Sequence, residues 1–154
     1  MQNRPFEDVE EMNRTLITNY NAVVSNADTV YLLGDICHHM TVEAANEIIK
    51  ELKGKKILIR GNHDKQYDPA LFEEITDFKT ISADGIYIAL MHYPMLSWPK
   101  SHHGSLQLHG HIHGRTENNE ANRIAGIRRY DVDVDANDYY PVSIKQIESF
   151  FEIR

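Results

Sequence analysis

Two short apolar runs, residues 29–33 and 57–59 (the second inside a predicted strand at 56–60), flank a segment whose apolar residues repeat with helical spacing. Both runs are nearly continuous in aliphatic and β-branched residues, which is typical of buried parallel strands. The segment between them, residues 41–53, has one apolar face and is followed by Gly54, a residue suited to the left-handed end of a helix. This order predicts a right-handed crossover between two parallel strands, and it places the two strand ends at the same edge of a sheet.

The rest of the chain predicts more strands and helices without a boundary between them, so we expect a single domain over residues 1–154. Asp84-Gly85 is a strong hairpin-turn signal between two strands. Tyr130 and Val132 alternate with acidic residues, which predicts a half-buried strand whose Asp131 and Asp133 face solvent. The expected elements are helices at 8–24, 68–75 and 144–151, strands at 78–82, 86–91, 105–108 and 130–134, and an exposed loop at 115–122.

The composition narrows the classes of function. The hydrophobic fraction of 42% and the charged fraction of 25% are ordinary for a globular protein. A net charge of −7 argues against a nucleic-acid-binding surface, which needs a clustered basic face. One cysteine, Cys37, excludes a disulfide within the chain and favours a reducing, cytoplasmic setting. No apolar run approaches the roughly 18 residues of a membrane-spanning helix, so we expect no membrane partner.

Chemically active side chains follow four of the predicted strands. Ligands gather beyond the carboxyl ends of strands in open α/β sheets, so we expect these side chains to meet there. Carboxylate, amide oxygen and imidazole together suit divalent manganese, iron, zinc, nickel or cobalt. The residues in this position are Asp35, Asn62, His63, Asp64, His92, His111 and His113.

The order of these motifs resembles that of the calcineurin-like metallophosphoesterase superfamily. The matching segments are Gly34-Asp35, Gly61-Asn62-His63-Asp64, His92 and Gly110-His111-Ile112-His113. The loop at residues 97–105 is also similar to a small bacterial and phage branch of that superfamily. The resemblance implies a four-layer α/β/β/α sandwich of mixed sheets, with the helices outside.

The resemblance also implies roles for individual residues. Asp35 would bridge two metal ions, Asn62, His92 and His111 would complete the second metal site, and His113 would bind the first metal. His63 would act as general acid or charge stabiliser, with Asp64 holding its ring. The implied reaction is in-line hydrolysis of a small phosphate ester, a monoester or a diester, by a metal-activated hydroxide. His102 and His103 would either approach the substrate phosphate or belong to a solvated loop.

One motif of the superfamily, an N-terminal Asp-x-His on the first strand, is absent from this sequence. The start could lie downstream of the natural one, the gene could be truncated, or His38 or His39 could replace the lost ligands; we favour the first two explanations. We therefore expect one firmly bound metal ion, two if the N-terminus is completed, and weak hydrolysis. The missing strand would leave a sheet edge that a second copy of the chain could cover. The alternative function is a non-catalytic binding module with an incomplete metal centre.

Overall fold

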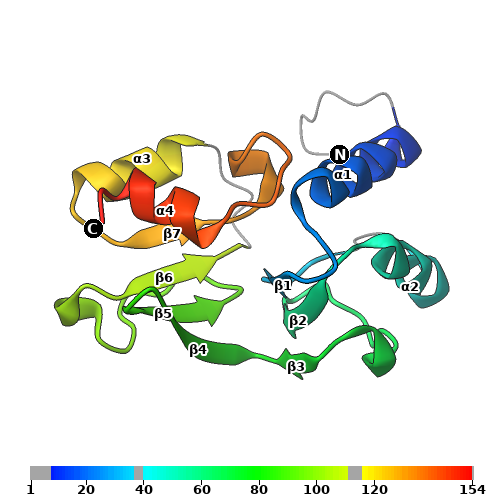
Figure 1. The fold of residues 1–154 in the computed structure, drawn as a ribbon, viewed down its shortest axis with the longest axis horizontal. Helices are drawn as coiled ribbons and strands as arrows, with labels where there is room; N and C mark the ends of the chain where they lie inside the picture. Colours follow the sequence, from blue (N-terminus) through cyan, green and yellow to red (C-terminus); the bar gives the residue numbers. More distant parts are fainter. Residues whose placement is uncertain (1–7, 37–39, 111–115, 154) are drawn as a thin grey trace.

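The computed structural model describes residues 8–36, 40–110 and 116–153. The chain forms four α-helices, seven strands and three short 3-10 helices within these residues (Figure 1). The helices are α1 (Val9–Val23), α2 (Val42–Glu51), α3 (Thr116–Ile124) and α4 (Ile144–Phe150), with 3-10 turns at Pro69–Leu71, Ser101–His103 and Val134–Ala136. The strands are β1 (Thr29–Leu32), β2 (Lys55–Ile59), β3 (Glu74–Thr76), β4 (Phe78–Ala83), β5 (Ile86–Met91), β6 (Leu106–His109) and β7 (Arg129–Asp131).

The first sheet has the order β1-β2-β3 and is parallel throughout the described residues. Strands β1 and β2 pair in parallel, with Tyr31 opposite Ile57, and α2 forms the crossover between them. Gly54 follows α2 with a φ of +91°, the left-handed conformation expected of it. The predicted strand, helix, strand unit is therefore confirmed, and the ends of β1 and β2 lie at one edge.

The second sheet has the order β4-β5-β6-β7 and is mixed. Strands β4 and β5 are antiparallel, whereas β6 and β7 add to β5 in parallel. Asp84 and Gly85 join β4 to β5 with φ values of +53° and +80°, as a tight hairpin between twisted strands requires. Because β5 and β6 are parallel, the residues that follow them meet at one end of this sheet.

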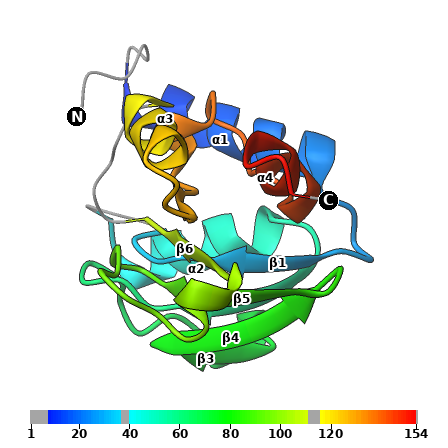
Figure 2. The same ribbon diagram turned by 90° about the vertical axis from the view of Figure 1, so that its left-hand side faces the viewer.

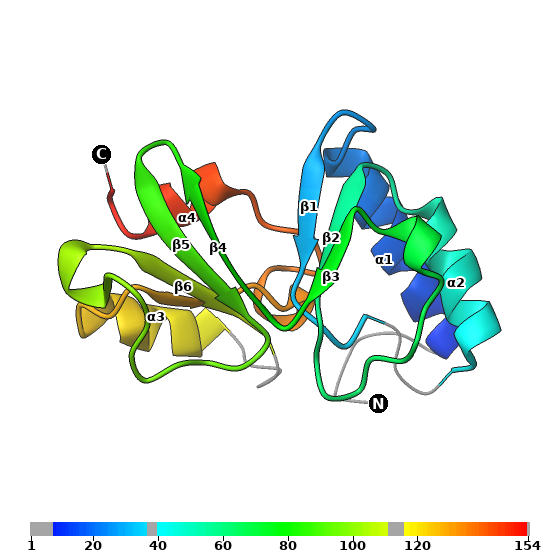
Figure 3. The ribbon, with the colours of Figure 1, turned by 90° about the horizontal axis from the view of Figure 1, so that it is seen from below.

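The two sheets pack face to face around the largest apolar cluster, with helices on the outside, as in the predicted α/β sandwich. Ile59 of β2 belongs to this cluster, whereas the preceding Leu58 faces the other way and packs against Ala45 and Ile49 of α2. Figure 3 shows α1 and α2 on the side of the first sheet that faces away from β4–β6. Figure 2 shows α3 and α4 on the side of β6 away from β4. The buried members of the cluster are Leu33, Ile59, Ile88, Leu90, Leu106, Leu108, Tyr130 and Ile147.

The helix starts carry the side chains that satisfy their free backbone N–H groups. Asp8 accepts a hydrogen bond from the Glu11 N–H at the start of α1. At α4, Ser143 and Gln146 form a reciprocal capping box. The buried residues of α1 are Ile17 and Tyr20, while Val9 and Val23, at its two ends, are 49% and 56% exposed.

Three predicted elements are wrong. Residues 68–75 were expected to be helical, but the turn capped by Asp68 ends at Leu71 and residues 74–76 pair with β2 as strand β3. Residues 116–124 form helix α3 although a loop was expected, because a polar helix carries little apolar periodicity. Strand β7 ends at Asp131, and this residue is fully buried instead of facing solvent.

Two features of the described structure concern possible partners, a second copy of the chain and a membrane. Strand β1 is an edge of its sheet, and no strand within residues 8–36, 40–110 and 116–153 pairs with its outer side. Coverage of that edge by a second copy of the chain stays a prediction. None of the helices described here is both long and apolar enough to cross a membrane.

Candidate metal centre

The chain turns sharply where β1 ends. Gly34 has a φ of +92° and Asp35 a φ of +53°, so two consecutive residues adopt left-handed conformations. A glycine adopts such a conformation readily, and aspartate is among the residues that tolerate it best. The turn directs the Asp35 carboxylate inward, and its side chain is only 5% exposed.

His92 follows β5 and is buried, with 1% of its surface exposed. Its Nδ1 lies 2.6 Å from the carbonyl oxygen of Leu33, the residue after β1. A carbonyl oxygen only accepts, so Nδ1 carries the proton. In the neutral imidazole the other nitrogen, Nε2, then presents a lone pair, and the Leu33 carbonyl fixes the tautomer in which His92 binds a cation.

Three electron-pair donors converge at this point. Nε2 of His92 lies 3.1 Å from Oδ1 of Asn62 and 3.2 Å from Oδ2 of Asp35. With His92 in the tautomer set by Leu33, none of these three atoms brings a hydrogen to the others. Oδ2 of Asp35 is buried and accepts no hydrogen bond from the described part of the chain. Imidazole, amide oxygen and carboxylate form a donor set that a divalent transition-metal ion prefers, so the residues fit a metal ion.

Two glycines make this convergence possible. A β-carbon on Gly34 would lie 2.5 Å from Nδ1 of His92. A β-carbon on Gly61 would lie 2.5 Å from Oδ1 of Asp35 and 2.8 Å from His92. All three distances are below van der Waals contact, so each glycine lets one strand-end loop lie directly against the others.

His63 and Asp64 lie in the loop after β2. The backbone N–H of His63 donates to Oδ1 of Asp35 at 2.8 Å, and the residue is solvent-exposed. The carboxylate of Asp64 accepts hydrogen bonds from the backbone N–H groups of Gly61, Asp35 and Ile36. The role predicted for Asp64, holding the His63 ring, stays a prediction.

The remaining predicted ligands, His111 and His113, lie outside the described residues, as do His38 and His39. Gly110, which immediately precedes His111, donates its N–H to the carbonyl oxygen of His92 at 2.9 Å. Among the described residues, no group of three or more histidine, cysteine or acidic side chains could hold a metal ion. Within the described residues, the candidate centre consists of one carboxylate, one imidazole and one amide.

His102 and His103 lie at the opposite end of strand β6 from His92. They belong to the exposed 3-10 turn before β6, whereas His92 is level with Gly110, directly after β6. His102 lines a groove of about 470 Å³ together with Trp98 and Arg128. Contact of His102 and His103 with a substrate stays a prediction.

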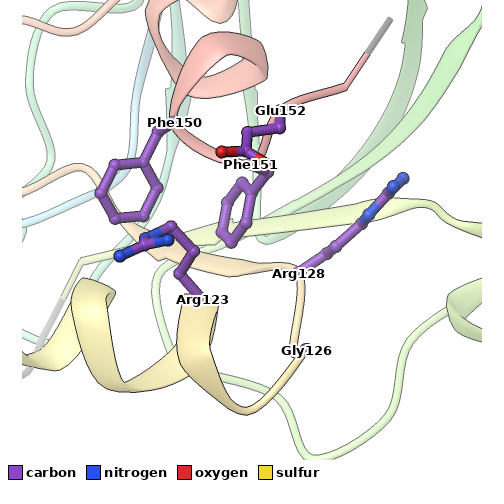
Figure 4. Close-up of a pocket in the computed structure, with 6 residues that line it drawn as sticks. All are labelled: Arg123, Gly126, Arg128, Phe150, Phe151 and Glu152. Carbon is purple, nitrogen blue, oxygen red and sulfur yellow. The ribbon is translucent and has the colours of Figure 1, made fainter.

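A second pocket, of about 320 Å³, lies between the end of α3 and α4 (Figure 4). Arg123 lies over the ring of Phe150 at 5.7 Å and pairs with Glu120 at 2.7 Å. The Glu120 carboxylate raises the pKa of Arg123 through this hydrogen bond and ion pair. This pocket contains a cation already neutralised by a carboxylate and gathers none of the predicted metal ligands.

Sequence reasoning missed two features of the site and one buried contact at the end of β7. Tyr67 is buried and donates its hydroxyl to Oδ1 of Asp64 at 2.8 Å. The carbonyl of Leu33 orients His92, and nothing in the sequence marks a backbone carbonyl for this task. Asp131 is buried at the end of β7, where Asn119 of α3 hydrogen-bonds its backbone N–H and carbonyl. An unusually polar helix face could have indicated the Asn119 contact.

Comparisons with known proteins identify the family of the chain. Residues 12–128 match the calcineurin-like phosphoesterase superfamily domain. The chain is 37% identical over 151 residues to the uncharacterized protein MJ1445 of Methanocaldococcus jannaschii, an alignment that covers 97% of this chain and 81% of that protein. It is 27% identical over 139 residues to the Gene 66 protein of Mycobacterium phage L5, covering 70% of this chain and 67% of that protein.

A solved structure shows the same fold. The crystal structure of the protein of unknown function AQ665 from Aquifex aeolicus superposes with a TM-score of 0.71 at 31% identity. The superposition covers 92% of this chain and 86% of that one. With the family match over residues 12–128, these likenesses place the chain in the calcineurin-like phosphoesterase superfamily.

Proposed function

We propose that this chain hydrolyses phosphate esters with the help of a divalent metal ion bound by Asp35, Asn62 and His92. The observation that carries the proposal is the convergence of Asn62 Oδ1 and Asp35 Oδ2 on Nε2 of His92, at 3.1 and 3.2 Å. Such a set of electron-pair donors is electrostatically unfavourable by itself and becomes favourable around a cation. His111 and His113 complete the proposed ligand set from the segment after Gly110.

Asp35, Asn62 and His92 would hold the metal, whereas His63 would act on the ester. A divalent ion bound at this place supplies a Lewis acid for the phosphoryl oxygens and lowers the pKa of water. His63 is exposed, and its backbone N–H donates a hydrogen bond to Asp35 at 2.8 Å. This hydrogen bond holds the backbone of His63 beside the site. We assign the His63 ring to proton transfer to the leaving-group oxygen of a small phosphate monoester or diester.

The test is Mn²⁺-dependent hydrolysis of an aryl phosphate monoester and of a bis-aryl phosphodiester. We expect release of the phenol only with added metal, and loss of this activity in Asn62→Ala and His63→Ala. The matched control is Asn21→Ala, because Asn21 hydrogen-bonds the backbone of residues 51 and 53 on the α1–α2 side of the fold. This control should retain the activity of the parent.

The two esters and the metal titration separate the alternatives. Hydrolysis of one ester alone identifies the substrate class. Metal binding without hydrolysis of either ester would contradict the proposed reaction and favour a binding module. Activity that persists unchanged in Asn62→Ala would remove Asn62 from the proposed ligand set.

A further inference from the structure

The carboxylate of Asp64 joins the loops that follow β1 and β2. Its Oδ2 accepts from the Asp35 N–H at 2.9 Å and from the Gly61 N–H at 2.7 Å. Its Oδ1 accepts from the Ile36 N–H at 3.1 Å and from the Tyr67 hydroxyl at 2.8 Å. Four hydrogen bonds thus reach one carboxylate, and three of them come from backbone groups of two different loops. Hydrogen bonds to a charged acceptor are stronger than neutral ones, so this carboxylate fixes both loops.

The loop that Asp64 holds is the strained one. Asp35 adopts a φ of +53°, a conformation that costs free energy in a residue with a β-carbon. The hydrogen bonds from the N–H groups of Asp35 and Ile36 to Asp64 lie directly before and after the Asp35 side chain. They therefore set the direction in which the Asp35 carboxylate leaves the backbone, toward Nε2 of His92 at 3.2 Å.

Tyr67 connects this arrangement to the hydrophobic core. Its side chain is 4% exposed and belongs to the cluster formed with Ala45, Ile49 and Leu58 between α2 and the first sheet. The ring also lies 6.2 Å from that of Phe72. A side chain held by packing presents its hydroxyl in one place, so the Tyr67 hydroxyl fixes the position of the Asp64 carboxylate.

We propose that Asp64 and Tyr67 are positioning residues that hold Asp35 in its metal-binding conformation, an inference that rests on the proposed function. Asp64 acts on the backbone of Asp35, and Tyr67 acts on Asp64. This role differs from orientation of the His63 ring, because the hydrogen bonds that carry it end on the N–H groups of Asp35, Ile36 and Gly61. Groups that orient metal ligands in this way commonly set the affinity for the metal.

The test uses Asp64→Asn and Tyr67→Phe in the full chain, with Tyr20→Phe as the matched control. Tyr20 is likewise buried, and its hydroxyl donates to the Lys53 carbonyl at 2.7 Å, but it lies between α1 and the first sheet. Each tyrosine variant thus removes one buried hydroxyl and keeps the ring. We expect Asp64→Asn to weaken Mn²⁺ binding, measured by calorimetry on metal-free protein, by about 10- to 100-fold. Tyr67→Phe should weaken it less, and Tyr20→Phe should leave it unchanged.

A second readout needs no metal. The ¹⁵N signals of the His92 ring, recorded at fixed pH in metal-free protein, report the nearby Asp35 carboxylate. Asp64→Asn and Tyr67→Phe should shift the Nε2 signal, whereas Tyr20→Phe should not. Parent-like Mn²⁺ affinity and parent-like His92 signals in both variants would overturn the proposal. So would a fall in kcat for Asp64→Asn at unchanged Mn²⁺ affinity, since that result would place Asp64 on the His63 ring.

A failure of the proposed function can be distinguished from a failure of the positioning role. A parent chain that binds no Mn²⁺ would contradict the metal site itself. The positioning role would then be decided by the His92 signals alone, because the hydrogen bonds of Asp64 to the Asp35 loop exist without a metal.

Discussion

Nε2 of His92 lies 3.2 Å from Oδ2 of Asp35, although the two residues are far apart in the sequence and follow strands of different sheets. Asp35 follows β1 of the parallel sheet, and His92 follows β5 of the mixed sheet. The carbonyl of Leu33 bridges them by accepting the Nδ1 proton of His92 at 2.6 Å. The candidate metal centre is therefore a junction between the two sheets of the sandwich, and its geometry depends on how closely they approach.

Gly61→Ala tests how much that close approach matters. The new methyl group would lie 2.5 Å from Oδ1 of Asp35 and 2.8 Å from His92, so one of them must move. We expect a loss of about 1–3 kcal/mol of unfolding free energy. Displacement of two ligands should also weaken Mn²⁺ binding by at least about tenfold. Denaturant unfolding and calorimetry measure the two effects.

Gly85→Ala is the control for that variant. Gly85 has a φ of +80° and nothing within 4 Å of an added β-carbon, so the substitution strains the hairpin without a clash. A loss of about 1–2 kcal/mol is expected from the left-handed conformation. Its Mn²⁺ affinity should equal that of the parent; a similar loss of affinity in both variants would mean that general destabilisation, not displaced ligands, weakens metal binding.

Leu90→Ala tests whether the apolar cluster between the sheets holds the fold together. Leu90 is 1% exposed within that cluster, so its truncation should lower the unfolding free energy by about 2–5 kcal/mol. Leu96→Ala removes the same atoms from a residue that is 97% exposed. This substitution should change the unfolding free energy by less than about 0.5 kcal/mol. Equal effects in urea unfolding would contradict the described packing.

Tyr20→Phe has an effect that depends on pH. Burial, and secondarily the charge of Asp28, raises the pKa of Tyr20 in the folded protein. In the unfolded chain it ionises near pH 10. Above that pH the unfolded state loses a proton that the folded state keeps, so the Tyr20 contribution to stability is present below about pH 10 and falls as the pH rises.

The variant cannot ionise at this position. At pH 7 it should be about 1 kcal/mol less stable than the parent, because the hydrogen bond to Lys53 is lost. The difference in unfolding free energy between parent and variant should become smaller above about pH 10. Unfolding curves at pH 7 and pH 10.5 check this; a gap that widens at the higher pH would contradict the direction of the Tyr20 pKa shift.

The periodic parts of the sequence predicted the fold well. Apolar runs around Tyr31 and Ile57 with an amphipathic helix between them led directly to the parallel pair, and Asp84-Gly85 led to the hairpin. The same logic placed Asp35 and Asn62 at one edge of the sheet, where the backbone N–H of His63, the residue after Asn62, donates to Asp35.

The misassigned elements lack periodicity of their own. Residues 74–76 pair as a strand with the edge of β2, and helix α3 contacts the end of β7 through Asn119. The contact of Tyr67 with the site could not be predicted from the sequence either. Its hydroxyl reaches Asp64 only through the packing of the ring against α2, and no spacing in the sequence encodes that contact.

The most direct test of the metal centre is a calorimetric titration of metal-free protein with Mn²⁺, performed on the parent, His92→Ala and Asn62→Ala. The convergence of Asn62 Oδ1 and Asp35 Oδ2 on His92 Nε2, at 3.1 and 3.2 Å, predicts tight binding of at least one ion per parent chain. Binding should be lost in His92→Ala and strongly weakened in Asn62→Ala. A parent that binds no Mn²⁺, or variants that bind it as the parent does, would contradict the account.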